Sequence, residues 1–179
     1  MKRQAIAPAD FVTRPTHLWA EQWLLLTAGD LRAKQFNPMT VAWGSFGTMW
    51  GKPFAQIVVR PQRYTLEFLQ RFPSFTLCAF GDKQREALNL CGSVSGRTVD
   101  KIKESGLTPM ATSVGAPAYE EAELVVECTK IYHQVMDPKG FIDREIEKNY
   151  DKKDYHHIFF GEIKAVQAVS SYVARRKAS

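Results

Sequence analysis

Four short stretches of the chain hold the polar, aromatic and glycine residues that could do chemistry. The first is NPMTVAWGSFGTMWGKP, residues 37–53, in which an Asn-Pro turn leads into a strand-like run. Thr40 and Ser45 stand where a core strand would have branched aliphatic residues, and Trp43 lies between them. Small residues flanked by aromatic ones let a flat ligand lie close to the backbone, but they also suit an ordinary barrel strand that bends at a glycine.

The second stretch, VVRPQRYTLEF at residues 58–68, combines cations with a helix start. Arg60 and Arg63 flank a proline, and Thr65 stands where a helix would begin. Guanidinium groups, a hydroxyl and the free N–H groups of a helix start can converge on one phosphate. The alternative interpretation is an ordinary helix cap with two solvated arginines.

The third stretch, CGSVSGRTVDK at residues 91–101, is a glycine- and serine-rich loop that feeds a short helix. Arg97 and Lys101 are four residues apart, so both cations can face the same side. Together with Ser95 and backbone N–H groups, they could surround a terminal phosphate. The order of residues differs from a P-loop, and a plain connecting loop is the other interpretation.

The fourth stretch is DYHHIFFGEI, residues 154–163, with a histidine pair at the start of a strand. One histidine could supply a hydrogen-bond donor beside an aromatic surface, although surface histidines without a function are common. No HExxH motif, Ser-His-Asp set or paired-carboxylate arrangement competes with this stretch.

The elements that must position these stretches are mainly strands. Residues rich in Val, Ile, Phe, Trp and Thr, bounded by Gly, Pro, Asn or Asp, predict strands over 22–28, 40–50, 54–60, 75–80, 122–135 and 157–169. Helices are expected over 65–72, 82–92 and 98–106, with Asp82 and Thr98 as N-caps of the last two. Because regular alternation of strands and helices is missing, we expect a mostly antiparallel closed sheet, a small barrel, with helices along one side.

Length and charge restrict the class of protein. A chain of 179 residues suits one domain, 1–179, with a barrel core over about 20–169 and terminal arms at 1–15 and 172–179. The net charge of +5 owes much to the two ends of the chain, so we expect neither a nucleic-acid partner nor a membrane. The sequence shows no signal peptide and no long apolar run, and we expect a cytoplasmic protein.

The three cysteines, Cys78, Cys91 and Cys128, are widely spaced and form no CxxC pair. Neither a disulfide framework nor a metal site is indicated. Cys78 and Cys128 lie in apolar stretches and are expected to be buried. Cys91 is interpreted as a structural residue rather than a redox thiol.

Taken together and in this order, the four stretches resemble the flavin reductase-like family of FMN-binding split barrels, and within it the branch that includes flavoredoxin. The resemblance runs from about Trp23 to Val166, and its marks are NPMTVAW, RPQRYT, SGRTVDK, LVVEC and HHIFFGEI. It implies a mainly β fold with short helices: a six-stranded antiparallel Greek-key split β-barrel that forms a homodimer, with FMN near the dimer interface.

The resemblance also implies which residues contact the cofactor. His156, five residues before Gly161, matches the family's histidine, and we expect it to donate to the N1/O2 side of the reduced flavin. The other matching positions are Asn37, Met39, Thr40 and Trp43 at the flavin, Arg60 and Thr65 at its ribityl-phosphate end, and Ser95, Arg97 and Lys101 around the phosphate.

The sequence departs from the family at a few positions. Thr98 replaces the family's aspartate, TMWGKP replaces the Ser-x-x-Pro-Pro stretch of flavin reductases, and His157 stands where many relatives have threonine. These changes concern the nicotinamide side more than the flavin.

The expected function is that of an FMN-binding oxidoreductase, similar to NAD(P)H:flavin reductases, with NADH or NADPH as electron donor. One alternative is a flavoredoxin-type carrier, which holds FMN tightly and has little NAD(P)H activity. A barrel that binds no flavin, such as an oligonucleotide-binding fold, is the third hypothesis. For the first two, the expected partners are a second copy of the chain and either a redox protein or a small-molecule electron acceptor.

Overall fold

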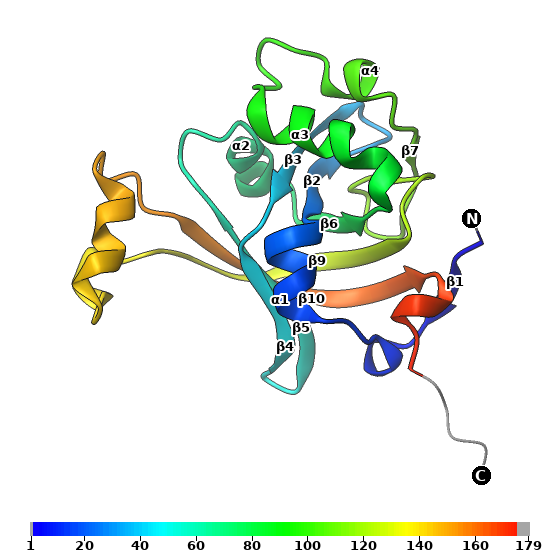
Figure 1. Ribbon diagram of the computed structural model, residues 1–179, viewed down its shortest axis with the longest axis horizontal. Coiled ribbons are helices and arrows are strands. Elements are labelled where there is room, and N and C mark those ends of the chain that lie inside the picture. The colour runs from blue at the N-terminus through cyan, green and yellow to red at the C-terminus, as the bar shows by residue number, and fades with distance from the viewer. Residues whose placement is uncertain (1, 175–179) are drawn as a thin grey trace.

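The structure, a computed structural model, describes residues 2–174, which form one large antiparallel sheet around an apolar core (Figure 1). Hydrogen bonds join the strands in the order β3-β2-β6-β9-β10-β5-β4, and β1 pairs with the C-terminal end of β10. The strands are β1 Gln4–Ile6, β2 Leu24–Asp30, β3 Gln35–Val41, β4 Gly44–Met49, β5 Lys52–Val59, β6 Ser74–Ala79, β9 Leu124–Val135 and β10 His157–Ala168, and a separate ribbon pairs β7 Pro109–Met110 with β8 Ala118–Tyr119.

The two ends of the sheet, β3 and β4, are consecutive pieces of the chain. Only Ala42 and Trp43 separate them. A Cβ atom at Gly44 would lie 2.4 Å from the carbonyl oxygen of Gln56 and 2.4 Å from the ring of Trp19, so glycine is required for this close turn over the core. The sheet therefore closes through a kinked strand, and no strand of the described chain pairs with the outer edge of β3.

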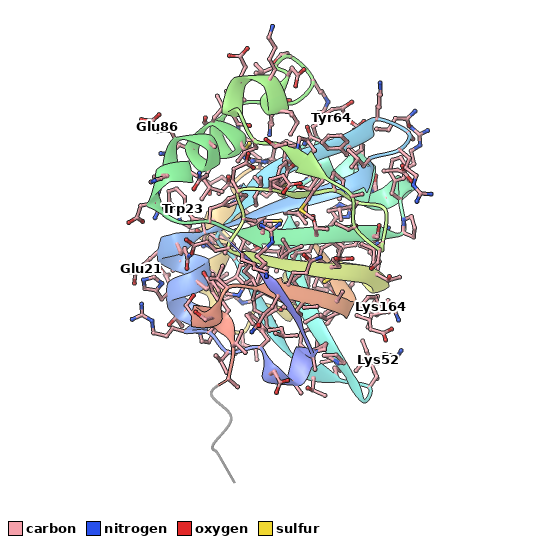
Figure 2. The ribbon with its side chains drawn as sticks, turned by 90° about the vertical axis from the view of Figure 1, so that its right-hand side faces the viewer. Glu21, Trp23, Lys52, Tyr64, Glu86 and Lys164 are labelled. Carbon is pink, nitrogen blue, oxygen red and sulfur yellow. The ribbon has the colours of Figure 1, made fainter. Side chains whose placement is uncertain are left out.

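The helices α2, α3 and α4 lie together at one end of the barrel (Figure 1). Figure 2 shows Trp23 between the N-terminal helical turns and α3, with Glu21 and Glu86 on either side. The helical segments are η1 Pro8–Asp10, α1 Pro15–His17, η2 Leu18–Gln22, α2 Thr65–Arg71, η3 Asp82–Gln84, α3 Arg85–Ser93, α4 Lys101–Ser105, η4 Pro138–Gly140, η5 Arg144–Tyr150 and η6 Ser170–Tyr172.

Both faces of β2 are buried, which explains why its LLLTAG sequence shows no alternation of apolar and polar residues. Leu24 and Leu26 belong to the core inside the barrel. Leu25 belongs instead to a second cluster, in which it packs with Leu88 and Cys91 of α3. The helix α3 therefore packs against β2, the strand that also forms hydrogen bonds with β3.

The segment between β9 and β10, residues 136–156, stands out from the body of the barrel (Figure 1). It carries η4 and η5, and the side chain of Ile142 is 99% exposed. The regular structure of this charged segment consists of two 3-10 helices, of three and seven residues.

The expected fold class, mainly β with short helices and an antiparallel sheet, is confirmed. The number of strands and the N-caps of two helices are corrected. The large sheet has eight strands where six were expected, because the chain kinks at Ala42 and Trp43 within the predicted strand 40–50 and because β1 adds an edge. The N-cap of α4 is Asp100, which accepts from two backbone N–H groups, rather than Thr98. Gly81, rather than Asp82, precedes η3.

The ends of the described chain pack on the barrel. β1 pairs with β10, Phe11 forms an isolated β-bridge with Val173, and Tyr172 is 8% exposed. Residue 1 and residues 175–179 of the predicted terminal arms lie outside the described residues. None of the helices within residues 2–174 is long and apolar enough to cross a membrane.

Candidate functional site

A cavity of about 290 Å³ opens beside the kink between β3 and β4. One wall is the consecutive run 39–43, and Val58 of β5 faces the same space. Arg60, Arg63 and His156 bring the polar groups. Of the residues that the sequence predicted as flavin contacts, the cavity brings together Met39, Thr40, Trp43, Arg60 and His156.

Thr40 fixes the wall of the cavity that β3 forms. The hydroxyl of Thr40 donates to the carbonyl oxygen of Leu88 at 2.5 Å and so ties the strand to α3. Trp43 is 52% exposed, and its ring centroid lies 5.3 Å from that of His156. Thr40 therefore stabilises the wall, whereas Trp43 offers an apolar surface to the cavity and to the solvent.

Asn37 and Thr65 meet at the start of β3, away from the cavity. The amide Nδ2 of Asn37 donates to Thr65 Oγ1 at 2.7 Å and to the carbonyl oxygen of Pro38 at 3.1 Å, and both side chains are buried. A Cβ atom at Gly96 would lie 1.9 Å from Asn37 Oδ1. Glycine at this position therefore lets the 95–98 loop lie directly over the asparagine.

Lys101 lies beneath β3, with only 4% of the residue exposed. Its ammonium group donates to the carbonyl oxygens of Pro38 and Cys91, both at 2.9 Å. Burial lowers the pKa of this ammonium from 10.5 to about 8. Cys91 is itself fully buried, and burial raises the pKa of its thiol. Lys101 thus joins the helical end of the barrel to the strand that carries the site.

A second cleft of about 630 Å³ follows β3 toward its N-terminal end. Asn37, Arg97 and Lys101 line it together with Lys34. Arg97 points outward: it donates to Glu67 at 2.5 Å and lies over the ring of Tyr64 at 4.6 Å. In the loop itself, the Ser95 hydroxyl accepts from the backbone N–H of Arg97 at 3.2 Å. The cleft thus brings together the cations of Lys34, Arg97 and Lys101, and positive charge of this kind favours an anion.

The two arginines at the cavity have different partners. Arg60 donates to Asp154 at 2.7 Å and to the carbonyl oxygen of Asn149 at 2.7 Å. Arg63 donates to the carbonyl oxygen of Gly92 at 2.9 Å, and burial lowers its pKa. Arg63 is therefore a partly desolvated cation without a carboxylate partner among the described residues, and an anion in the cavity would stabilise it.

His156 is 6% exposed, and its Nδ1 lies 2.8 Å from the hydroxyl of Tyr150. Burial, reinforced by the charge of Arg60, lowers the pKa of His156 to about 4, while Asp154 acts in the opposite direction. At neutral pH the imidazole is therefore uncharged. The adjacent His157 points elsewhere and pairs with His133 at 2.9 Å.

The structure thus distributes the predicted residues over two neighbouring clefts along β3. Thr65 reaches the site only through Asn37, and Ser95 lies in the loop above it. Sequence reasoning missed Tyr150, which lies in the charged run EKNYDKKDY and gives no pattern signal there. It noted Arg63 beside Arg60 but did not place it among the contacts. Within the described residues, no cluster of His, Cys, Asp or Glu could hold a metal ion.

Comparison with protein families gives one match, the flavin reductase like domain, over residues 19–176. No curated protein matches the sequence significantly.

Several solved structures share the fold at low identity. A flavoredoxin of Desulfovibrio vulgaris (Miyazaki F) superposes with a TM-score of 0.65 at 22% identity, over 89% of this chain and 73% of that one. A flavoredoxin of Methanosarcina acetivorans superposes with a TM-score of 0.65 at 20% identity, over 100% of this chain and 82% of that one. An NADH:FAD oxidoreductase of Streptomyces globisporus superposes with a TM-score of 0.63 at 18% identity, over 88% of this chain and 86% of that one. At these identities the likeness shows the fold alone.

We expect the buried charge of Lys101 to appear in the pH dependence of stability. The folded protein releases this proton near pH 8 and the unfolded chain near pH 10.5, so stability contributed by this group rises with pH between the two values. Lys101→Met removes this rise. Urea denaturation below, within and above the window measures it, with Lys103→Met, an exposed lysine of the same helix, as the control. If the free energy of unfolding depended on pH equally in wild type and Lys101→Met, this would contradict the burial of the ammonium group.

Proposed function

The chain belongs to the flavin reductase-like family, and from that premise we propose that it binds FMN beside β3 and acts as a flavin-dependent oxidoreductase. The proposal rests on the groups that meet at the cavity. At the cavity, the end of a strand with an unpaired outer edge meets two guanidinium groups and an uncharged, buried imidazole. This combination suits a flat, hydrogen-bonding ring that becomes negatively charged when it is reduced.

The residues at the cavity fit the flavin ring. The pyrimidine end of a flavin carries alternating N–H and C=O groups, which free backbone groups of an edge strand can match. The volume of about 290 Å³ stands at the lower end of the range for ligand sites, roughly 300–1,000 Å³, so it suits the ring without the whole ribityl chain. A larger hollow of about 780 Å³ near Phe11, Phe46 and Ile163 is lined by uncharged residues and lacks such cations.

The cleft that follows β3 suits the phosphate. Asn37 lines this cleft and Met39, two residues further along the strand, lines the cavity, so one extended ligand can occupy both. Arg97 and Lys34 bring positive charge to the cleft, and Lys101 lies below it. The ion pair between Arg97 and Glu67 is exposed, and such pairs cost little to break. Arg97 can therefore turn from the carboxylate to a phosphate.

When bound, FMN supplies the redox chemistry, and the residues of the chain orient it and adjust its charge. Arg60 and Arg63 keep the cavity positive, which favours the anionic reduced form of the ring. His156 stays uncharged and holds one N–H for hydrogen bonding. Trp43, which is 52% exposed, offers an apolar surface against which the ring can pack.

As the reaction we propose electron transfer from NADH or NADPH to the bound flavin, and from there to a redox protein or a small-molecule acceptor. A flavoredoxin-type carrier is the second candidate. It is favoured by the hairpin TMWGKP, which replaces the Ser-x-x-Pro-Pro stretch that flavin reductases have and exposes Trp50 to 59%. The structures that share the fold include both flavoredoxins and an NADH:FAD oxidoreductase.

We also propose that the protein forms a homodimer through the outer face of β4, β5, β9 and β10. Trp50, Tyr132 and Phe160 form an aromatic patch there, with ring centroids 5.8–6.0 Å apart. Lys52 and Lys164 lie on the same side of the barrel, both paired with Glu162 (Figure 2). Trp50 occupies a tight turn at a φ of 54°, a conformation that favours Asn or Gly. A strained and exposed tryptophan points to an interface role.

For the cell compartment we propose the cytoplasm. Cys78, Cys91 and Cys128 are all free and buried, which suits a reducing environment.

The cofactor site is tested by comparing FMN with riboflavin. We expect Arg97→Gln to raise the dissociation constant of FMN about tenfold, because a charge-assisted contact with the phosphate is lost, and to leave that of riboflavin unchanged. Fluorescence titration measures both. Arg71→Gln, an exposed arginine over Phe72, is the control with the same change of charge. An equal loss for both ligands would reject the phosphate site, and a protein that binds neither flavin would reject the function.

The reductase and the carrier differ in their response to pyridine nucleotides. We expect NADH or NADPH to bleach the absorbance of bound FMN under anaerobic conditions, because the half-exposed Trp43 borders the cavity on the solvent side, where a nicotinamide ring can reach the flavin. Stopped-flow absorbance follows the reaction, and dithionite gives the fully reduced reference. Bleaching by dithionite but by neither nucleotide would favour the carrier.

The proposed dimer predicts that a substitution at Trp50 weakens dimerisation without lowering the thermal stability of the monomer. We expect Trp50→Asn to weaken dimerisation at least about tenfold, because an aromatic anchor is removed. The same change suits the turn, so thermal stability of the monomer stays equal or rises. Sedimentation velocity and thermal denaturation measure the two quantities. A monomeric wild-type protein, or a variant that dimerises as well as wild type, would contradict this interface.

A further inference from the structure

Tyr150 and His156 are the two buried residues of a mostly exposed segment, residues 136–156. Tyr150 is 4% exposed, while Asn149 and Asp151 on either side are exposed. The segment 136–156 leaves the barrel after β9 and returns at the start of β10 (Figure 1). Its charged sequence gives no reason for a buried tyrosine, so the burial must come from specific contacts.

Arg60 supplies these contacts from the cavity side. Its guanidinium lies over the ring of Tyr150, 5.2 Å from the centroid, and donates to Asp154 and to the carbonyl oxygen of Asn149. On another side, the ring of Phe141 stacks on Tyr150 with centroids 5.6 Å apart. The tyrosine is therefore clamped, and its hydroxyl has a fixed direction.

That hydroxyl meets Nδ1 of His156 at 2.8 Å. Burial raises the pKa of the Tyr150 phenol, so it keeps its proton, while burial keeps the imidazole of His156 uncharged. The alternative acceptor is the thioether of Met136 at 3.4 Å, and sulfur accepts hydrogen bonds weakly. The hydroxyl therefore donates to Nδ1, and the single imidazole proton lies on Nε2.

We propose that Tyr150 is a positioning residue that fixes the Nε2–H tautomer of His156, so that this histidine presents a hydrogen-bond donor to the cavity. No described residue hydrogen-bonds to Nε2, and His156 lines the cavity beside Trp43. With the opposite tautomer, Nε2 would present a lone pair and repel an electron-rich ligand. Resting on the function proposed above, the receiver of this hydrogen bond is an electron-rich oxygen or nitrogen of the reduced flavin ring.

Arg60 has two roles in this arrangement. It raises the positive potential at the cavity, and at the same time it holds the tyrosine that orients the histidine. Asp154 fixes Arg60 in that position through the ion pair at 2.7 Å. The path from Asp154 through Arg60 and Tyr150 to His156 resembles the way in which partners of a functional histidine set its tautomer in other sites.

The tautomer can be measured in the flavin-free protein by ¹⁵N NMR of histidine-labelled samples. We expect a pyridine-like shift at Nδ1 and a pyrrole-like shift at Nε2 of His156 in wild type. In Tyr150→Phe the loss of the donor averages the two shifts and raises the pKa of the imidazole, since the neutral form is no longer stabilised. Tyr155→Phe removes a hydroxyl from the same aromatic group, where it contacts Glu147, and serves as the matched control.

A proton on Nδ1 in wild type, or shifts that are the same in Tyr150→Phe and wild type, would overturn the proposal. With FMN bound, we expect Tyr150→Phe to slow flavin reduction about tenfold, as for other partners that orient a functional histidine, while the dissociation constant of FMN changes less than about twofold. An equal loss of binding and reduction would make Tyr150 merely structural. Failure to bind FMN would reject the proposed function, yet the tautomer result in the flavin-free protein would stand.

Discussion

An unpaired strand edge is the constraint on which the site depends. β3 lies at one end of the hydrogen-bonded sheet, and its chain turns through Ala42 and Trp43 into the strand at the other end. A closed ladder would have used the backbone groups of β3 on both sides. The kink leaves one side without a strand partner, and residues of β3 line both clefts. Exposed strand edges invite pairing with other chains, and here the kink and Pro38, which has no N–H group, limit that pairing.

Buried polar contacts keep this edge in place without pairing it. The carbonyl oxygen of Pro38 accepts from both Asn37 and Lys101, and Thr40 donates to α3. The contacts of Lys101 and Thr40 tie β3 to the helical end of the barrel. They lie in a poorly solvated environment, where an unpaired partner is costly. The rigid wall that results can hold a ring in one position. On the facing side, the Arg60 clamp orders the segment 136–156 around His156.

Much of this architecture could be predicted from the sequence, because strand composition and turn residues are local signals. The strands at 54–60, 75–80 and 157–169 agree with the structure within two residues. The kink inside 40–50 could not be predicted, since it depends on the contact of Gly44 with Trp19, which is far along the chain. Tyr150 was hidden for the same reason. Its burial depends on Arg60, and a charged run around a tyrosine looks like any solvated loop. Lys101 was expected at a phosphate, yet its side chain turns to buried carbonyl oxygens, a choice that spacing alone cannot reveal.

The proposed function places the flavin ring in the cavity at the end of β3. Titration of the ¹⁵N-labelled protein with FMN, followed by backbone amide shifts, tests this placement most directly. We expect the largest changes at residues 39–43 and at His156, with smaller changes along residues 95–98, beside the cleft proposed for the phosphate. Changes confined to the larger hollow around Phe11 and Phe46, with β3 unaffected, would contradict it.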